Sequence, residues 1–141
     1  MFVDASVIIS ILTNEDDGEP FAAILDGISQ KVTSVVATWE ASVGLFRKTG
    51  LSMGESRTIV QDFLRVADIE VLAIVSEDED LALKIFETNG WHSVSEKERN
   101  RALNMADCFH YAVARRLGMP ILTKDAGFAS TDLVVLGLSS R

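Results

Sequence analysis

The sequence predicts an α/β fold, specifically a three-layer α/β/α sandwich around a short parallel sheet. Two observations support this prediction. Short apolar runs alternate along the chain with stretches whose apolar residues recur at helical spacing. Such alternation is typical of a parallel sheet that is covered by helices on both faces. The chain has 141 residues and contains no internal repeat or Pro/Gly-rich linker. We therefore expect one domain that spans residues 1–141.

The predicted strands are short apolar runs, each followed by a helix or turn signal. The run from residue 69 to residue 75 is the most continuous, which is typical of an inner strand of a parallel sheet. The predicted strands cover residues 1–4, 32–37, 69–75, 119–123 and 133–136.

Helix signals fill the first half of the chain between these strands. Asp4-Ala5-Ser6 opens a helix that continues to residue 12, and Pro20 fits the first turn of the next helix. A third helix is predicted from about residue 38 to residue 49, where Gly50 follows as a C-terminal cap. Ser52 and Glu55 then resemble a capping box, which predicts that a fourth helix starts there.

The second half of the chain carries similar signals. Ser76 with Glu79 forms another capping-box pattern, and Gly90 ends the helix that it starts. Residues 91–103 fit either a helical turn or an exposed loop. A strong helix is predicted for residues 104–117, and residues 125–130 are predicted to form a short turn or helix. The predicted core face of the 104–117 helix consists of Ala106, Phe109, Val113 and Leu117.

Composition and charge restrict the possible function classes. The net charge of −8 counts against simple nucleic-acid binding, because neutralising phosphates requires Lys and Arg. Carboxylates that hold a metal ion account for part of this acidity, and bound cations reverse the local field. Apolar residues make up 48% of the chain, which suggests a surface that is buried against a partner or a second copy.

The sequence also predicts a cytoplasmic protein. Cys108 is the only cysteine, so no disulfide can form within the chain, and a reducing compartment is expected. With one Cys and two His, a structural zinc site is not expected. The N-terminus lacks the basic region of a secretory signal, and no apolar run reaches the roughly 20 residues that a membrane span needs.

Four acidic residues lie at boundaries where a strand ends or a helix begins. In an open parallel sheet, such boundaries collect in one crevice outside the carboxyl ends of the strands. Carboxylates gathered there repel one another unless a cation lies among them. The pattern therefore predicts a Mg²⁺- or Mn²⁺-dependent enzyme that acts on phosphodiesters. The candidate catalytic and metal-binding residues are Asp4, Glu40, Asp107 and Asp125.

Each of these acids also has an ordinary structural interpretation. Asp4, Asp107 and Asp125 lie where a side chain can cap a helix or turn. Glu40 is predicted to lie in the first turn of its helix, where an acid favours the helix dipole. A structural role is favoured for His110, one turn after Asp107, although orientation of a substrate remains an alternative.

Rival chemistries lack their motifs. The sequence has no phosphate-binding loop of the G-x-x-x-x-G-K-[ST] or G-x-G-x-x-G type and no G-x-S-x-G elbow. A phosphorylated receiver domain is disfavoured because the third predicted strand ends in Ile74-Val75-Ser76 rather than in an aspartate. The acidic run 77–80 is interpreted as a solvated start of a helix, outside the site.

Several motifs resemble the PIN-domain ribonucleases and, within them, the VapC toxins of VapBC toxin–antitoxin pairs. The resemblance spans essentially the whole chain, and its most specific part is the stretch 103–112. The segments that carry it are Phe2–Ser6, Glu40, Leu103–Ala112, Leu122–Phe128 and Thr131–Leu133.

The resemblance implies a metal-dependent endoribonuclease whose carboxylates at Asp4, Glu40, Asp107 and Asp125 bind Mg²⁺ or Mn²⁺. It further implies cleavage of RNA to a 5′-phosphate and a 3′-hydroxyl, a homodimer, and inhibition by a cognate antitoxin. Family members often carry more acid, or a Gly-Asp-type turn, where this chain has Asp125-Ala126-Gly127. Asp132 is therefore the reserve candidate for the fourth ligand.

Neighbouring residues are expected to support this chemistry. Ser6 and Thr123 are predicted to orient ligands or water. Arg47 and Lys48 are expected to serve the C-terminal end of their helix instead. The candidates for guiding RNA are Lys97, Arg99, Arg101 and Lys124. The alternative function is a non-catalytic PIN-like module for protein interaction, in which the acids serve only as caps.

Overall fold

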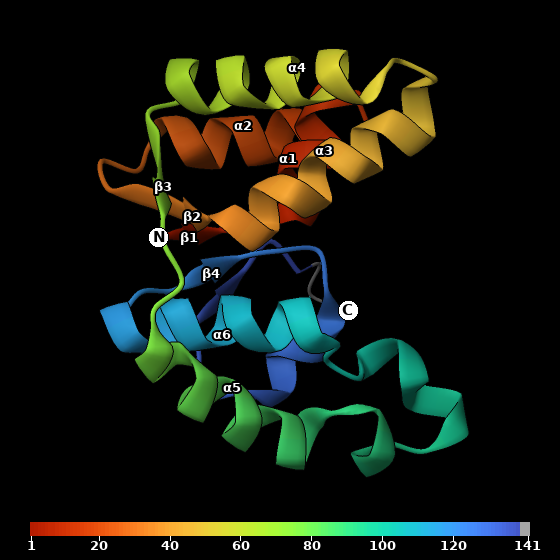
Figure 1. Cartoon of the computed structure of the whole chain (residues 1–141), viewed down its shortest axis with the longest axis vertical. Helices are drawn as coiled ribbons and strands as arrows, with labels where there is room; N and C mark the ends of the chain where they lie inside the picture. The colour runs from red at the N-terminus through yellow and green to blue at the C-terminus, as the bar shows by residue number, and fades with distance from the viewer. Residues whose placement is uncertain (139–141) are drawn as a thin grey trace.

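Among residues 1–138, which the computed structural model describes, five parallel strands form one sheet in the order β3-β2-β1-β4-β5 (Figure 1). The last three residues of the predicted domain 1–141 lie outside the described residues. The first strand in sequence is thus the central one, hydrogen-bonded to β2 and to β4. The strands are β1 (Phe2–Val3), β2 (Lys31–Ser34), β3 (Ile69–Leu72), β4 (Ile121–Leu122) and β5 (Val135–Leu136).

Helices connect the strands. The α-helices are α1 (Ala5–Leu12), α2 (Gly18–Asp26), α3 (Val35–Thr49), α4 (Met53–Val66), α5 (Ser76–Asn89) and α6 (Met105–Leu117). The part of the chain that the structure describes also contains three short 3₁₀ helices, of which η1 (Trp91–Ser93) and η2 (Glu96–Arg101) lie between α5 and α6 and η3 (Ala126–Ser130) lies between β4 and β5. None of the helices within residues 1–138 combines the length and the apolar character that crossing a membrane requires.

The two faces of the sheet pack against different helices. Successive strand residues point to opposite faces, so Val3 joins one apolar cluster and Phe2 joins the other. The first cluster lies under α1, α2 and α4, and the second lies under α5 and α6, as the arrangement in Figure 1 shows. The predicted three-layer α/β/α architecture is therefore confirmed.

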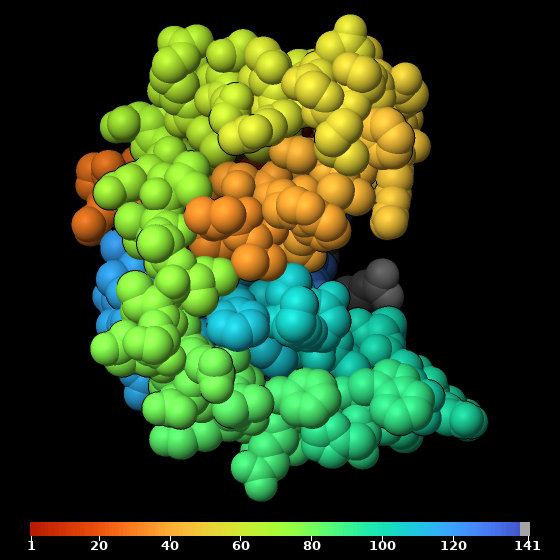
Figure 2. Space-filling model, viewed as in Figure 1, coloured from red at the N-terminus to blue at the C-terminus, as the bar shows by residue number. Residues whose placement is uncertain are grey.

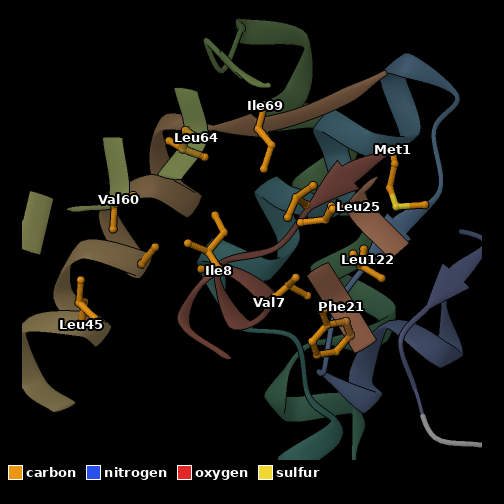
Figure 3. Packing of buried hydrophobic residues seen from close by; sticks show 13 residues of the cluster. Met1, Val7, Ile8, Phe21, Leu25, Leu45, Val60, Leu64, Ile69 and Leu122 are labelled. Carbon is orange, nitrogen blue, oxygen red and sulfur yellow. The ribbon is translucent and has the colours of Figure 1, made fainter. Parts of the chain in front are cut away.

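The first cluster shows why the apolar spacing of these helices matters. Val7 and Ile8 of α1 lie at its centre, fully buried, between the sheet and the surrounding helices (Figure 3). Phe21 enters from α2 and Leu45 from α3. Burial of side chains of this size stabilises the fold by roughly 1.5–3 kcal/mol each. This packing fixes α1 and α3 against the end of β1, where the candidate site begins.

Two predicted boundaries of the sheet are wrong. The predicted strand 32–37 ends at Ser34, because the Ser34 hydroxyl accepts a hydrogen bond from the backbone N–H of Ala37 and starts α3 three residues early. Glu40 therefore lies in the second turn of α3, not in the first. The predicted inner strand 69–75 is an edge strand, β3, which pairs only with β2 and leaves Val71 exposed.

Two predictions for the second half of the chain are also corrected. Helix α5 starts at Ser76, and the carboxylate of Asp78, not that of Glu79, accepts the backbone N–H of Val75 at 2.9 Å. Asp78 is fully buried and pairs with Arg116, so the acidic run 77–80 is not wholly solvated. Helix α6 is buried over a wider face than predicted, because it lies between the sheet and α5.

Candidate active site

Asp4 is oriented by two hydroxyl groups at the carboxyl end of the central strand. Its backbone N–H donates to the carbonyl oxygen of Leu122 at 3.0 Å, and this bond fixes Asp4 beside β4. Its Oδ2 accepts hydrogen bonds from the Ser6 hydroxyl at 2.6 Å and from the Thr123 hydroxyl at 2.7 Å. The carboxylate makes no capping bond to α1, so the interpretation of Asp4 as a side-chain cap is wrong. The contacts agree with the orienting role predicted for Ser6 and Thr123.

Glu40 reaches the same place from α3 and meets His110 of α6. The Nε2 atom of His110 lies 2.5 Å from Oε1 of Glu40 and 3.7 Å from Oδ1 of Asp4. One potential metal-ligating atom from each of Asp4, Glu40 and His110 lies within 4.8 Å of the other two. The sequence interpretation favoured a structural role for His110 and left it out of the site. The sequence signal that could have placed His110 in the site is its spacing of one helical turn from Asp107.

Asp107 is held at the start of α6 by a reciprocal cap. Its Oδ2 accepts the backbone N–H of Asn104 at 3.0 Å, and the side chain of Asn104 accepts the backbone N–H of Asp107 at 2.9 Å. This reciprocal cap confirms the predicted capping role of Asp107. It also fixes the buried Asp107 carboxylate in one position, so the structural and the functional interpretations of this residue are compatible.

Asp125 is placed by the tight turn that follows β4. Its Oδ1 accepts the backbone N–H of Gly127 at 2.8 Å, and its own N–H donates to the hydroxyl of Thr123 at 2.9 Å. A side chain at Gly127 would lie 2.7 Å from the carbonyl oxygen of Arg101, so only glycine fits at this turn. The Asp125-Ala126-Gly127 sequence therefore still delivers a carboxylate to the site.

The four predicted acids lie together in one hollow, which we call the acidic cleft. Asp4, Glu40, Asp107 and Asp125 all line it, and its volume is about 370 Å³. The reserve candidate Asp132 lies elsewhere, where it accepts hydrogen bonds from Tyr111 and Arg115.

Burial and neighbouring charges shift the pKa values of Asp107, Asp125 and His110. Burial, together with the charges of Asp125 and Asp4, raises the pKa of Asp107 to about 7. Burial also raises the pKa of Asp125, and Asp4 and Glu40 add to that rise. Burial alone would lower the pKa of His110, but the hydrogen bond to Glu40 and the surrounding carboxylates outweigh it and raise the pKa. The cleft therefore attracts positive charge.

These donors fit a divalent cation. Carboxylate oxygens are the ligands that Mg²⁺ and Mn²⁺ prefer, and close packing of like charges is relieved when a cation binds among them. Burial is the main cause of the raised pKa of Asp107, and the charges of Asp125 and Asp4 add to it, as expected for like charges that lie close together. The side chains of Asp4, Glu40, Asp107 and Asp125 are the ones that would hold the ion.

The basic residues around the cleft differ from those predicted. Arg47 lines the cleft, which the sequence interpretation missed because the residue also lies in the last turn of α3. Lys124 is held beside the cleft by Glu15 and Asp17. The guanidinium of Arg99 instead stacks on the Trp91 ring at 3.7 Å. Neither Lys97, Arg99 nor Arg101 is among the described residues that line the cleft.

Comparisons with known proteins agree on one family. The family model for the PIN domain matches residues 1–133. The curated protein "VapC ribonuclease Mb0640" of Mycobacterium bovis is 28% identical over 139 residues, which cover 98% of this chain and 99% of that protein. The structure of Mycobacterium tuberculosis VapC20, described as a sarcin-ricin loop cleaving toxin, superposes with a TM-score of 0.70 at 17% identity and covers 94% of this chain and 95% of its own. A toxin–antitoxin complex from Klebsiella pneumoniae superposes with a TM-score of 0.67 at 12% identity over 96% of this chain and 95% of its own.

Proposed function

The chain belongs to the PIN-domain family, and from this premise we propose that it is a metal-dependent endoribonuclease, the toxin of a toxin–antitoxin pair. The observation that carries the proposal is the acidic cleft, in which four carboxylates from separate elements meet beside a buried histidine. Full-length similarity to proteins named VapC ribonucleases supports the same activity.

We propose that Asp4, Glu40, Asp107 and Asp125 hold Mg²⁺ or Mn²⁺ for the hydrolysis of RNA. When bound, the ion supplies Lewis acidity, which activates water for attack and offsets the charge that builds up on the phosphate. The oxygen of water forms a bond to phosphorus, the bond from phosphorus to the 3′ oxygen breaks, and the proton passes to that leaving oxygen. The products carry a 5′-phosphate and a 3′-hydroxyl.

The remaining residues of the cleft bind and orient. The hydroxyls of Ser6 and Thr123 donate to Oδ2 of Asp4, and the other carboxylate oxygen, Oδ1, faces Nε2 of His110. The guanidinium of Arg47 offers a charge-assisted contact for an RNA phosphate at the edge of the cleft. This local positive charge reduces the objection that a net charge of −8 raises against RNA binding.

Removal of the metal is expected to stop cleavage. Total RNA incubated with the purified protein and Mg²⁺ or Mn²⁺ should yield discrete fragments with 5′-phosphate ends. In EDTA the rate should fall at least about 100-fold, because Lewis-acid catalysis supplies several kcal/mol. Restoring Mg²⁺ should restore the cleavage. Equal cleavage with and without EDTA would contradict the proposal, and no cleavage under either condition would favour the alternative interaction module.

We further propose that a cognate antitoxin inhibits the protein and that both act in the cytoplasm. The similarity to a solved toxin–antitoxin complex supports such a partner. Cys108, the only cysteine of the chain, is buried and free, which agrees with a reducing compartment.

We also propose that two copies associate through an apolar face, defined by Val35, Val36, Trp39, Met105 and Ala106. The start of α3 and the start of α6 lie side by side there, as the orange and cyan surfaces of Figure 2 show. The exposed fractions of Val35, Trp39 and Met105 are 56%, 65% and 73%. Large apolar side chains gathered in this way are typical of a surface that a partner covers.

A charge placed in this face is expected to prevent self-association. Val35 is the first residue of α3, where glutamate is favourable for the helix dipole, so Val35→Glu should leave the fold intact. Sedimentation velocity should show a dimer for the wild-type protein and a monomer for the variant. The matched control is Val134→Glu, at an exposed valine outside the apolar face. Dimers of both variants would contradict this location of the interface.

A further inference from the structure

His110 is a buried ring whose polar contacts all lie on the side of the acidic cleft. Its side chain is fully buried in α6, with Phe2 packed against it at 5.4 Å between ring centroids. Nε2 contacts Glu40 and approaches Asp4. Nδ1 is buried and has no hydrogen-bond partner among residues 1–138. The carboxylates that the ring faces are thus the only described polar groups that its nitrogens contact.

We propose that His110 is a direct ligand of the divalent ion, through Nε2, beside Asp4 and Glu40. The inference rests on the proposed function in that it assumes an ion in the acidic cleft. The distances from Nε2 to Oε1 of Glu40 and to Oδ1 of Asp4 are 2.5 and 3.7 Å. Both are shorter than twice a typical ligand bond of about 2.1 Å, and the ligand atoms of all three residues lie within 4.8 Å of one another, so a small movement of the side chains lets one ion contact all three.

A nitrogen ligand changes which ion the cleft prefers. Mg²⁺ is bound almost entirely by oxygen, whereas imidazole suits transition metals, and the affinity of a mixed site rises along the first-row series. The cleft therefore selects Mn²⁺ over Mg²⁺ more strongly than carboxylates alone would. The ion takes the place of a proton on Nε2, and in the metal-free protein Nε2 bonds to Glu40 instead.

The experiment uses the full-length protein without a histidine tag, loaded with Mn²⁺ alone. Electron spin echo envelope modulation detects nitrogen bound directly to Mn²⁺, and the chain contains only two histidines, His92 and His110. Wild type and the control His92→Gln should both show ¹⁴N modulation, and His110→Gln should lose it. In the same variant, the affinity for Mn²⁺ measured by calorimetry should fall at least about 10-fold and the affinity for Mg²⁺ by less.

A measurement on the wild-type protein makes the test independent of whether His110→Gln folds. Incorporation of ¹⁵N-histidine should replace the ¹⁴N pattern with a ¹⁵N pattern. If Mn²⁺ binds and Asp4→Asn removes it, yet no nitrogen modulation appears, His110 is not a ligand and the inference is overturned while the proposed function stands. If wild type binds no Mn²⁺ at all, the inference and the proposed function both fail.

Discussion

Asp107→Asn is expected to abolish RNA cleavage while making the metal-free protein more stable. Loss of a ligand carboxylate should lower the rate at least about 100-fold, because metal-assisted hydrolysis depends on the charge of the ligands. The fold should survive, since the amide oxygen of asparagine can still accept the backbone N–H of Asn104 and keep the helix cap.

The gain in stability follows from the raised pKa of Asp107. The folded protein holds the proton up to a pH of about 7, whereas the unfolded chain releases it near 3.8. Between these values the folded state binds more protons, so the free energy of unfolding falls as the pH rises. The loss of unfolding free energy that the ionised Asp107 causes is absent below about pH 4 and fully present above about pH 7, where it is on the order of 2–4 kcal/mol.

Urea unfolding of the metal-free protein between pH 4 and pH 8 measures this effect. Wild type should lose stability across the range, and Asp107→Asn should lose less of it. The matched control is Asp132→Asn, an exposed aspartate outside the cleft, whose ion pair with Arg115 contributes little. Asp132→Asn should retain cleavage. Full activity of Asp107→Asn with Mg²⁺ would disprove the assignment of Asp107 to the site.

Asp78→Ala is expected to destabilise the protein by about 3 kcal/mol, the largest effect that we predict outside the acidic cleft. The Asp78 carboxylate is fully buried and accepts Nε of Arg116 at 2.6 Å, Nη2 of Arg116 at 3.2 Å and the backbone N–H of Val75 at 2.9 Å. Its removal leaves a partly buried guanidinium without a partner and takes the cap from α5. The expected fall in melting temperature is about 10 °C.

Thermal unfolding of four variants separates the ion pair from a general effect of lost charge. Glu77→Ala removes a neighbouring exposed acid and should change stability by less than about 0.5 kcal/mol. Asp78→Leu with Arg116→Leu should be more stable than Asp78→Leu alone, because no uncompensated charge remains. Equal stability of Asp78→Ala and Glu77→Ala would show that the buried ion pair does not stabilise the fold.

Local signals in the sequence were sufficient for most of the architecture. The Ser52–Glu55 capping box and the predicted cap at Asp107 both form, because the two partners of each lie within one helical turn. Gly50 and Gly118 end their helices with left-handed backbone angles. The boundary at Ser34 was missed because Val35 and Val36 favour strands locally, whereas the cap at Ser34 and the packing of α3 start the helix there.

Contacts between distant residues could not be read from local patterns. Asp78 looked solvated because Arg116, its partner, lies 38 positions away. His110 looked structural because Glu40 lies 70 positions away and comes from a different helix. The four acids were predicted together because a parallel sheet brings the carboxyl ends of its strands to one edge, and the resemblance to PIN-domain ribonucleases implied the same four residues. The parallel topology was therefore sufficient to predict that the acids meet, whereas the contacts of individual side chains could be seen only in the structure.

The central position of β1 has a consequence for synthesis on the ribosome. The first residues of the chain pair with Ile121 and Leu122, and the Asp4 carboxylate needs the hydroxyl of Thr123. A nascent polypeptide thus cannot bring Asp4, Asp107 and Asp125 together until the segment around Thr123 has emerged from the ribosome. If the protein is the proposed nuclease, its cleft therefore forms only late in synthesis, and the elongation time before that point is available for supplying an antitoxin.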